Sequence, residues 1–418
     1  MLRPSLALLI LGSLAGLTAS PCMAQAPAQS AAAKECLRLD AKPADQIPWD
    51  QHERVYKRWV EVCREAAAAD GNNQQIKHVL ARSLMATGQR AEAIPLWRQL
   101  AEQNDAGAAF EIYDMYKSYF RGDVDKPQLV KRAEAEQGLR KAAELGDTYA
   151  ILMLAVLLDR GDTVKRDNTD AIRWAERAVS NPAKDRSRSD MQVLLGRLLV
   201  KSEDPVQKAR GLALLERLAQ AGPYNAKTQL AIAIRANDPI RARSLLEQGM
   251  RVDPGGAIPP FADMLFKGEG GPADSKRAVL LLSGGRASDV PGVKGALGML
   301  YIEGKYVPRD LKKGIDLFRT WASWDYDARL QLMKLLADNP ELTISYPGAI
   351  LYDATEAAEL GEPGALAALI NLKLSLSAQF RDEAGGCKLV MEAAKQGDSV
   401  AAQRLPKCSA VTHNGGSQ

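Results

Sequence analysis

Ala142-Ala-Glu-Leu-Gly146 has the form of a helix end, in which two small or apolar residues and a polar residue are followed, after one further residue, by glycine. The same pattern returns as Leu218-Ala-Gln-Ala-Gly222, Leu245-Leu-Glu-Gln-Gly249, Ala357-Ala-Glu-Leu-Gly361 and Ala393-Ala-Lys-Gln-Gly397. With weaker copies included, successive helix ends lie about 36 residues apart. A period in this range predicts stacked helix pairs. We therefore expect an all-α solenoid of about ten antiparallel helix pairs.

The composition favours a packed helical protein without a nucleic-acid partner. Hydrophobic residues make up 46% of the 418 residues and aromatic residues only 6%. Lys and Arg number 55 against 51 Asp and Glu, for a net charge of +4. Nucleic-acid-binding proteins usually carry a strong basic excess on one face. No such block is present in the sequence.

The N-terminus has the pattern of a secretory signal peptide over residues 1–24. Arg3 supplies the basic region, Leu6 to Leu17 form a short apolar run, and Cys22-Met-Ala24 provides small residues before a cleavage site after Ala24. Residues 25–34 form a flexible lead-in. These features predict a periplasmic protein with no transmembrane span after cleavage. Lipid attachment at Cys22 is the alternative, although Pro21 stands where a lipoprotein signal has Gly or Ala.

The mature chain keeps two local pairs of cysteines, one at each end of the array. The pairs are Cys36 with Cys63, and Cys387 with Cys408. Four cysteines allow three connectivities. Stacked repeats hold the two ends apart, which favours the local pairs and makes residues 35–70 a disulfide-stapled N-terminal cap. Each bridge is expected to contribute about 3 kcal/mol in an oxidising compartment. Buried free thiols are the alternative.

Aromatic residues mark the candidate binding surface. Tyr113 and Tyr116 lie in the most aromatic stretch of the chain, and Trp321 and Trp324 lie where a repeat ends irregularly. One interpretation is that they line the groove of the array and contact a partner or a sugar ring. The alternative is that they pack between repeats.

The repeats resemble known families. Residues 71–137 are similar to tetratricopeptide repeats, and residues 138–405 resemble Sel1-like repeats. The Sel1-like match is carried by Ala296-Leu-Gly-Met-Leu-Tyr301, Gly304 and Arg309-Asp310, and by Gly146-Asp147, Gly161 and Trp174 in an earlier unit. The resemblance implies a right-handed superhelix and a role in protein–protein interaction. Residues 406–418 are expected to form a disordered tail.

A narrower similarity concerns exported scaffolds of exopolysaccharide assembly. Leu300-Tyr-Ile-Glu-Gly-Lys-Tyr-Val-Pro-Arg-Asp310 is similar to the repeats of the alginate-assembly type. This implies envelope protein partners and, directly or through them, a polysaccharide. The cysteine-rich Sel1-like branch, linked with β-lactam hydrolysis, pairs cysteines in nearly every repeat, whereas this chain does not.

The sequence contains no motif that requires catalysis. It has no Gly-x-Ser-x-Gly elbow and no Ser-x-x-Lys. None of its three histidines lies at metal-ligand spacing from a cysteine. We therefore predict a non-enzymatic scaffold with no catalytic residue, cofactor or metal. A β-lactamase-like hydrolase and a direct polysaccharide-binding module are the alternatives.

Overall fold

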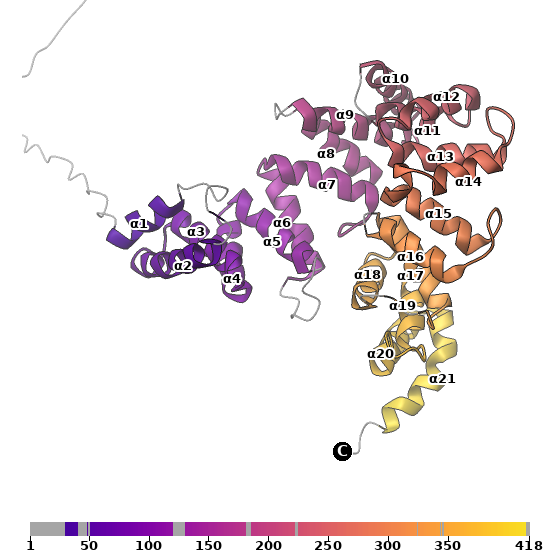
Figure 1. The fold of residues 1–418 in the computed structure, drawn as a ribbon. Coiled ribbons are helices and arrows are strands. Elements are labelled where there is room, and N and C mark those ends of the chain that lie inside the picture. The colour runs from indigo at the N-terminus through magenta and orange to yellow at the C-terminus, as the bar shows by residue number, and fades with distance from the viewer. Residues whose placement is uncertain are drawn as a thin grey trace, which may run out of the picture. The chain divides into compact units, whose positions relative to one another are not determined.

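The structure is a computed structural model that describes residues 30–40, 48, 51–119, 130–180, 185–221, 225–323, 325–342, 344 and 347–414. All regular elements within these residues are helical (Figure 1). The predicted signal peptide therefore lies outside the described residues. In the described part, no helix is long and apolar enough to cross a membrane.

The chain divides into two compact units, Met1–Ala93 and Ile94–Gln418. The first contains α1 (Ala31–Asp40), α2 (His52–Ala69), α3 (Gln74–Ala86) and the start of α4 (Arg90–Glu102). The first half of the second unit continues with α5 (Ala106–Tyr119), α6 (Arg132–Glu144), α7 (Thr148–Arg160), α8 (Asn168–Ser180), α9 (Asp185–Val200), α10 (Pro205–Ala221), α11 (Ala226–Ile234) and α12 (Pro239–Gly249).

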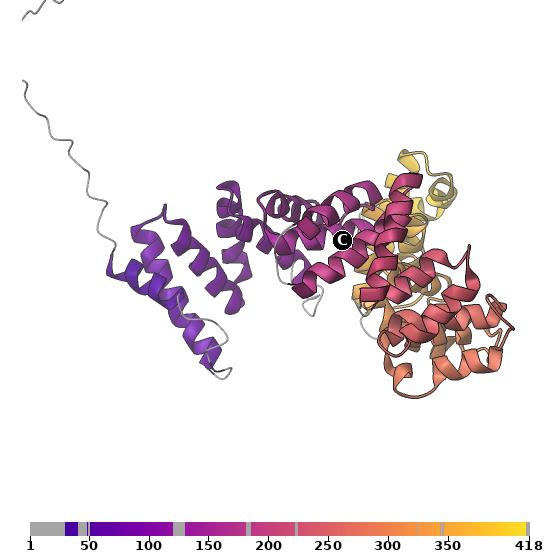
Figure 2. The ribbon, with the colours of Figure 1, turned by 90° about the horizontal axis from the view of Figure 1, so that it is seen from above.

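The remaining elements complete the second unit. They are α13 (Pro254–Lys267), α14 (Ser275–Ser283), the 3₁₀ helix η3 (Arg286–Asp289), α15 (Pro291–Glu303), α16 (Leu311–Ala322), α17 (Tyr326–Asp338), α18 (Pro347–Glu359), α19 (Ala365–Lys373), α20 (Glu383–Lys395) and α21 (Ser399–Asn414). Figure 2 shows the helices of this unit stacked one pair after another. The expected all-α solenoid is confirmed. Helix α21 continues to Asn414, into the segment that we expected to be a disordered tail from residue 406.

Local sequence signals set the ends of the helices. The Asp147 carboxylate caps α7 by accepting the Ala150 N–H at 2.7 Å, and Asp310 caps α16 by accepting the Lys313 N–H at 3.0 Å. A side-chain acceptor at this position satisfies an N–H group that has no partner within the helix. Gly161 ends α7 in the left-handed conformation, with φ of 82°. Gly268 ends α13 in the same way, as expected for a loop between paired helices.

Small residues allow adjacent helices to pack closely. Gly298 on α15 and Gly314 on α16 face one another, and a Cβ at Gly298 would lie 2.7 Å from the Gly314 carbonyl oxygen. Bulky neighbours then fill the remaining space. Phe318 is completely buried beside this crossing. The core consequently runs from pair to pair instead of forming one central cluster.

Ion pairs join successive even-numbered helices in the second unit. We call this series the arginine ladder. It has N–O distances of 2.5 to 2.9 Å and consists of Arg98–Glu134, Arg140–Asp170, Arg210–Glu176, Arg241–Glu216 and Arg277–Glu247. Partly exposed pairs each contribute only about 0.2–1 kcal/mol. The ladder therefore aligns neighbouring repeats more than it stabilises them.

Disulfides close both ends of the helical array, in the predicted pairing. Cys36 and Cys63 join α1 to α2, and Cys387 and Cys408 join α20 to α21, each with an S–S distance of 2.04 Å. All four residues are buried. Terminal helices have a neighbour on one side only, so a covalent link there offsets the missing packing.

Candidate functional site

The structure places the predicted aromatic residues mostly inside the protein. Tyr113 and Tyr116 on α5 are 3% and 1% exposed. This placement corrects the expectation that they line an open groove and agrees with the packing alternative. Trp321 is half-buried against Phe318, with ring centroids 5.4 Å apart. Trp324 lies outside the described residues.

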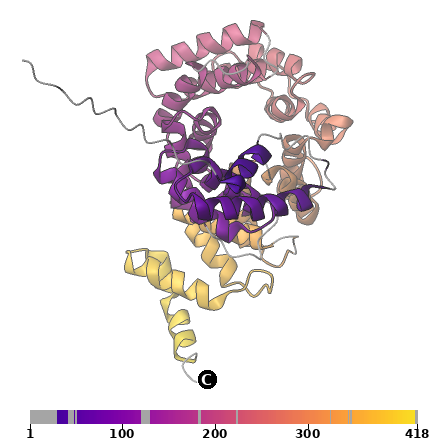
Figure 3. The ribbon, with the colours of Figure 1, turned by 90° about the vertical axis from the view of Figure 1, so that its left-hand side faces the viewer.

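Tyr116 belongs to a buried polar cluster that joins helices far apart in the sequence. We call this cluster the polar clasp. It consists of Tyr116 and Lys117 on α5, Asp162 in the α7–α8 connection, Arg329 on α17, and Tyr352, Asp353 and Glu356 on α18. In Figures 1 and 3 the orange helices α17 and α18 come back beside the magenta segment that contains α5 and α7.

Asp162 is the central anion of the polar clasp. Its two carboxylate oxygens accept hydrogen bonds from different helices, one from Lys117 Nζ at 2.6 Å and the other from Arg329 Nη2 at 2.8 Å. Arg329 Nη1 also lies 3.4 Å from Asp353 Oδ1. Charge-assisted bonds of this kind are the stronger ones in proteins. A single carboxylate therefore links α5 to α17.

A second set of hydrogen bonds links α5 to α18. The Tyr116 hydroxyl donates to Glu356 Oε1 at 2.7 Å, and the Tyr352 hydroxyl donates to the Tyr116 oxygen. Glu356 is only 2% exposed. A buried carboxyl is stable only where hydrogen bonds or opposite charges replace its hydration. Tyr116 provides one of these replacements from a helix 240 residues away in sequence.

More exposed ion pairs surround the polar clasp. Arg132 Nε on α6 lies 3.3 Å from Glu359 Oε2, and its Nη1 lies 3.1 Å from Glu136 Oε2. Arg166 pairs with Asp327 and lies 3.8 Å from Glu362 Oε1. Each of these two arginines therefore faces two carboxylates, one or both from the α17–α19 segment.

The backbone of the α7–α8 connection is shaped to present Asp162. Residues 161–164 are all buried, which is unusual for a connecting segment. Thr163 has a positive φ of 67°, an uncommon conformation for a β-branched residue. Arg132 Nη1 donates to the Thr163 carbonyl at 3.1 Å. These contacts hold the carboxylate of Asp162 toward Lys117 and Arg329.

Burial and charge move the pKa values of the three carboxyls in opposite directions. Burial raises the pKa of Glu356 to about 7, and the charge of Asp162 acts in the same direction. Burial also raises the pKa of Asp353 to about 6, against the opposing effect of Arg329. For Asp162, burial alone would raise the pKa, but Lys117 and Arg329 outweigh it and lower the pKa to about 2.

One tyrosine of this region lacks a hydrogen-bond partner. Tyr326 on α17 is 2% exposed, and its hydroxyl has no partner among the described residues. Arg329 lies over its ring, 5.3 Å from the centroid. Burial raises the pKa of Tyr326, so the phenol stays protonated at neutral pH. Its role here is to cover the Arg329 guanidinium.

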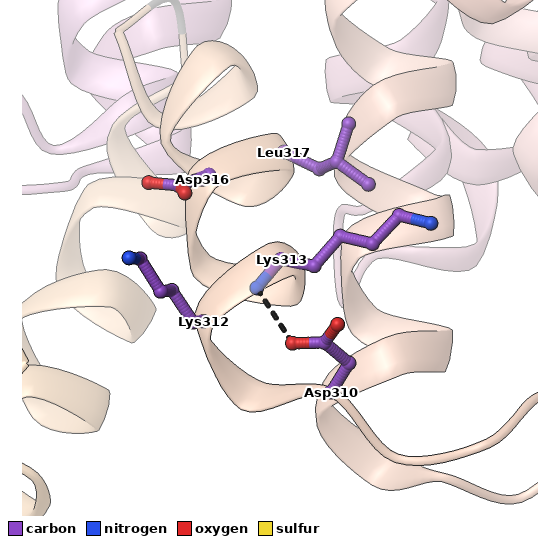
Figure 4. A pocket seen from close by; sticks show the side chains of 5 residues that line it. All are labelled: Asp310, Lys312, Lys313, Asp316 and Leu317. Carbon is purple, nitrogen blue, oxygen red and sulfur yellow. Dashed lines mark hydrogen bonds between the residues drawn. The ribbon is translucent and has the colours of Figure 1, made fainter.

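A separate open pocket lies at the start of α16. It has a volume of about 360 Å³ and is lined by Asp310, Lys312, Lys313, Asp316 and Leu317 (Figure 4). Asp310 is engaged as the cap of α16. The Lys313 ammonium donates to the Tyr301 hydroxyl at 2.8 Å. Two of the lining residues are thus engaged in the repeat itself, Asp310 with the backbone of α16 and Lys313 with Tyr301 on α15. Within the described part, no three His, Cys, Asp or Glu residues are grouped to hold a metal ion.

Sequence reasoning did not identify the polar clasp. Lys117, Asp162, Arg329 and Glu356 are single charged residues in a chain where a quarter of the residues are charged. The nearest signal was Asp162 directly after the Gly161 helix end, in a connection that the repeat pattern leaves unspecified. Only the tertiary arrangement brings these residues together.

Comparisons with known proteins identify the repeats. The Sel1 repeat family matches residues 148–181, 262–283 and 296–323, so the chain contains Sel1 repeats. These ranges cover α7 and α8, part of α13 with all of α14, and part of α15 with all of α16. No curated protein is similar enough to count as a relative.

Two solved structures illustrate the similarity. A Sel1 repeat protein from Oxalobacter formigenes is 24% identical over 78% of this chain and 97% of its own, with a TM-score of 0.38. The protective antigen c5321 of uropathogenic Escherichia coli, which has an SLR fold, is 18% identical over 91% of this chain and 79% of its own, with a TM-score of 0.39. The assignment of the repeats depends on the family match and not on these superpositions.

Proposed function

We propose that this chain is an exported scaffold that binds a protein partner in the bacterial envelope without catalysing a reaction. The observation that carries the proposal is a helical array that contains Sel1 repeats and has a disulfide at each end. Repeat arrays present extended surfaces, and the function depends on the residues that packing leaves on those surfaces. Disulfides persist in oxidising compartments such as the periplasm.

The internal roles of the conspicuous residues support a binding function. Asp147 and Asp310 cap helices, Gly161 ends one, and the arginine ladder connects the even-numbered helices. Ion pairs also join odd-numbered helices, for example Arg197 on α9 with Asp159 on α7, and we assign the partner surface to the side chains that these pairs leave exposed on the odd-numbered helices. Ile232 on α11 is 47% exposed and Tyr149 on α7 is 57% exposed.

A photo-crosslinking experiment tests the binding proposal. A photoreactive amino acid would replace Ile232 on α11 or, as a matched control, Ile240 on α12, which is 73% exposed. Expression in the native host, ultraviolet irradiation and mass spectrometry would then identify adducts. We expect one discrete protein adduct from position 232 and much less from position 240. Adducts from position 240 alone would overturn the assignment of the face, and no adduct from either would overturn the scaffold function.

Export is tested separately by cell fractionation. We expect the full chain to be recovered in the periplasm, starting at residue 25 and with both disulfides formed. Deletion of residues 1–24 should retain the protein in the cytoplasm with reduced cysteines. A membrane-bound form that carries lipid on Cys22 would replace the periplasmic assignment.

Exopolysaccharide assembly is the narrower form of the proposal. It is supported by the similarity of Leu300 to Asp310 to the repeats of such scaffolds. The crosslinked partner should then be a component of polysaccharide synthesis or export, and a deletion strain should secrete less polymer. A partner from an unrelated envelope process would overturn this narrower form while leaving the scaffold function intact. Absence of turnover with nitrocefin and with peptidoglycan is expected, and clear turnover would favour a hydrolase.

A further inference from the structure

The polar clasp is an interface between segments that a simple solenoid would keep apart. Each repeat of a solenoid normally contacts only its neighbours. Here Asp162 bonds to Arg329, 167 residues away, and Tyr116 bonds to Glu356, 240 residues away. The hydrogen bonds and ion pairs that cross the interface join charged or hydroxyl-bearing side chains. Such an interface depends on electrostatics far more than an apolar core does.

The interface carries more acids than bases. Inside the polar clasp, the cations Lys117 and Arg329 face three carboxyls, those of Asp162, Asp353 and Glu356. The surrounding Arg132 and Arg166 each face two carboxylates as well. A buried carboxylate without its own cation is costly, and a proton is the simplest compensation.

We propose that the polar clasp is a pH-controlled closure, in which a proton on the Glu356 carboxyl holds α17 and α18 against α5 and the α7–α8 connection, and loss of that proton favours their separation. Asp353, on the same helix, contributes in the same direction. The opened form exposes the faces of α5 and α18 that the closed form buries. The proposal does not depend on the scaffold function or on export.

The groups around Glu356 make it the residue that responds. Its neighbours on every packed element are titratable or charged: Tyr113, Tyr116 and Lys117 on α5, Arg132 on α6, Asp162 in the α7–α8 connection, Tyr326 and Arg329 on α17, and Tyr352, Asp353 and Glu359 on α18. The basic groups among them are engaged by other acids. Lys117 and Arg329 bond to Asp162, and Arg132 pairs with Glu136 and Glu359.

The direction of the pH effect follows from proton binding. In the closed form the pKa of Glu356 is raised from 4.5 to about 7, and that of Asp353 from 3.8 to about 6. In an opened form both carboxyls meet water and return toward their ordinary values. The closed form therefore binds more protons between these limits, so closure weakens as the pH rises. Above the raised values both forms are deprotonated and the effect levels off.

Distance measurement between two spin labels tests the closure. Labels carried by unnatural amino acids at Tyr149 on α7 and Leu376, which is 89% exposed after α19, report on the two sides without adding cysteines. At about pH 5 we expect one short distance. Toward about pH 8 a longer distance should gain population, by up to about tenfold per pH unit for each proton released. As a control, labels at Tyr149 on α7 and Val206 on α10 should give the same distance at every pH.

Two variants on α18 separate the switch from a general effect of charge. Glu356→Gln keeps a neutral group that accepts the Tyr116 hydrogen bond, so we expect it to remain closed at about pH 8. Glu359→Gln, at an exposed position one turn later, should respond to pH as the native chain does. Circular dichroism and intact disulfides would show that both variants are folded.

The proposal has clear contrary outcomes. A native chain with the same distance distribution at both pH values would overturn it, whether that distance is short or long. A Glu356→Gln variant that opens with pH as the native chain does would also overturn it, because another group would then control the closure.

Discussion

At the scale of single residues, the fold depends on two kinds of position. At one kind, two helices pack so closely that only glycine fits, and at the other, a side chain must accept a hydrogen bond from a backbone N–H that has no partner within its helix. Gly298 and Gly314 let α15 and α16 touch through their backbones. Asp310 at the start of α16 satisfies an N–H group that the helix itself leaves open. Both requirements are local, so both have measurable single-residue consequences.

Gly298→Ala should destabilise the second unit. The added methyl group would lie 2.7 Å from the Gly314 carbonyl oxygen, so the helices must move apart. Overpacking of this kind costs about 1–3 kcal/mol. Gly348→Ala is the matched control, because its Cβ meets no atom within 4 Å on a helix where alanine is favoured. Urea unfolding of both variants checks the prediction, and equal midpoints would contradict it.

Asp310→Ala should remove the cap of α16. Loss of an aspartate cap costs about 0.5–2 kcal/mol because the Lys313 N–H loses its acceptor. Asp310→Asn keeps an acceptor oxygen and should lose much less. Hydrogen exchange of the first turn of α16 is the measurement. Equal protection in the alanine and asparagine variants would show that the side chain does not cap the helix in solution.

At the scale of elements, stability depends on the contacts that each helix makes with its neighbours. Interior helices pack on both sides, while α1 and α21 lie at the ends of the array and are each joined to the preceding or following helix by a disulfide. The two bridges enclose short loops with separations of 27 and 21 residues. Their effects should therefore stay local.

Removal of one bridge should loosen one end only. Replacing Cys387 and Cys408 together by serine should destabilise α20 and α21 by about 3 kcal/mol, as expected for a loop of this length. Hydrogen exchange should accelerate there and stay unchanged in α7 and α8. Faster exchange along the whole second unit would show instead that the repeats unfold as one cooperative block.

At the scale of the whole molecule, the polar clasp adds a long-range link to the contacts between neighbouring helices. The free energy of closure depends on carboxyl groups whose titrations act in opposite directions. Raised pKa values at Glu356 and Asp353 weaken closure as the pH rises, whereas the lowered pKa of Asp162 acts at the acid end. The closure should therefore be strongest near the ordinary carboxyl values, at about pH 4.

Acid should weaken the polar clasp through Asp162, relative to its maximum at about pH 4. Its pKa is about 2 when closed and 3.8 ordinarily, so its contribution is present above 3.8 and is lost as the pH falls toward 2. The Tyr149–Leu376 label pair should report this change. The Glu356→Gln variant should show it too, because the loss of closure below about pH 4 depends on Asp162 and not on Glu356. An opened population that is the same at about pH 4 and at about pH 2 would contradict the central role of Asp162.

Local patterns in the sequence were sufficient to predict the helical repeats. The recurrence that ends in Gly146, Gly249 and Gly361 predicts stacked helix pairs, because glycine and small residues act within one or two turns. The pairing of Cys36 with Cys63 follows from their closeness along an array. The same reasoning left open whether Tyr113 and Tyr116 line a groove or pack between repeats, since a helix face alone does not show what covers it.

By itself, the sequence determined the all-α class, the period, the glycine ends of the helices and the positions of the terminal bridges. Only the tertiary structure decided that α5 and the α7–α8 connection meet α17 and α18 through Asp162 and Glu356. The physical reason is that the meeting of distant repeats depends on the sum of many small rotations between neighbouring pairs. No short stretch of sequence contains that sum, so the partners of isolated charged residues become known only when the array is folded.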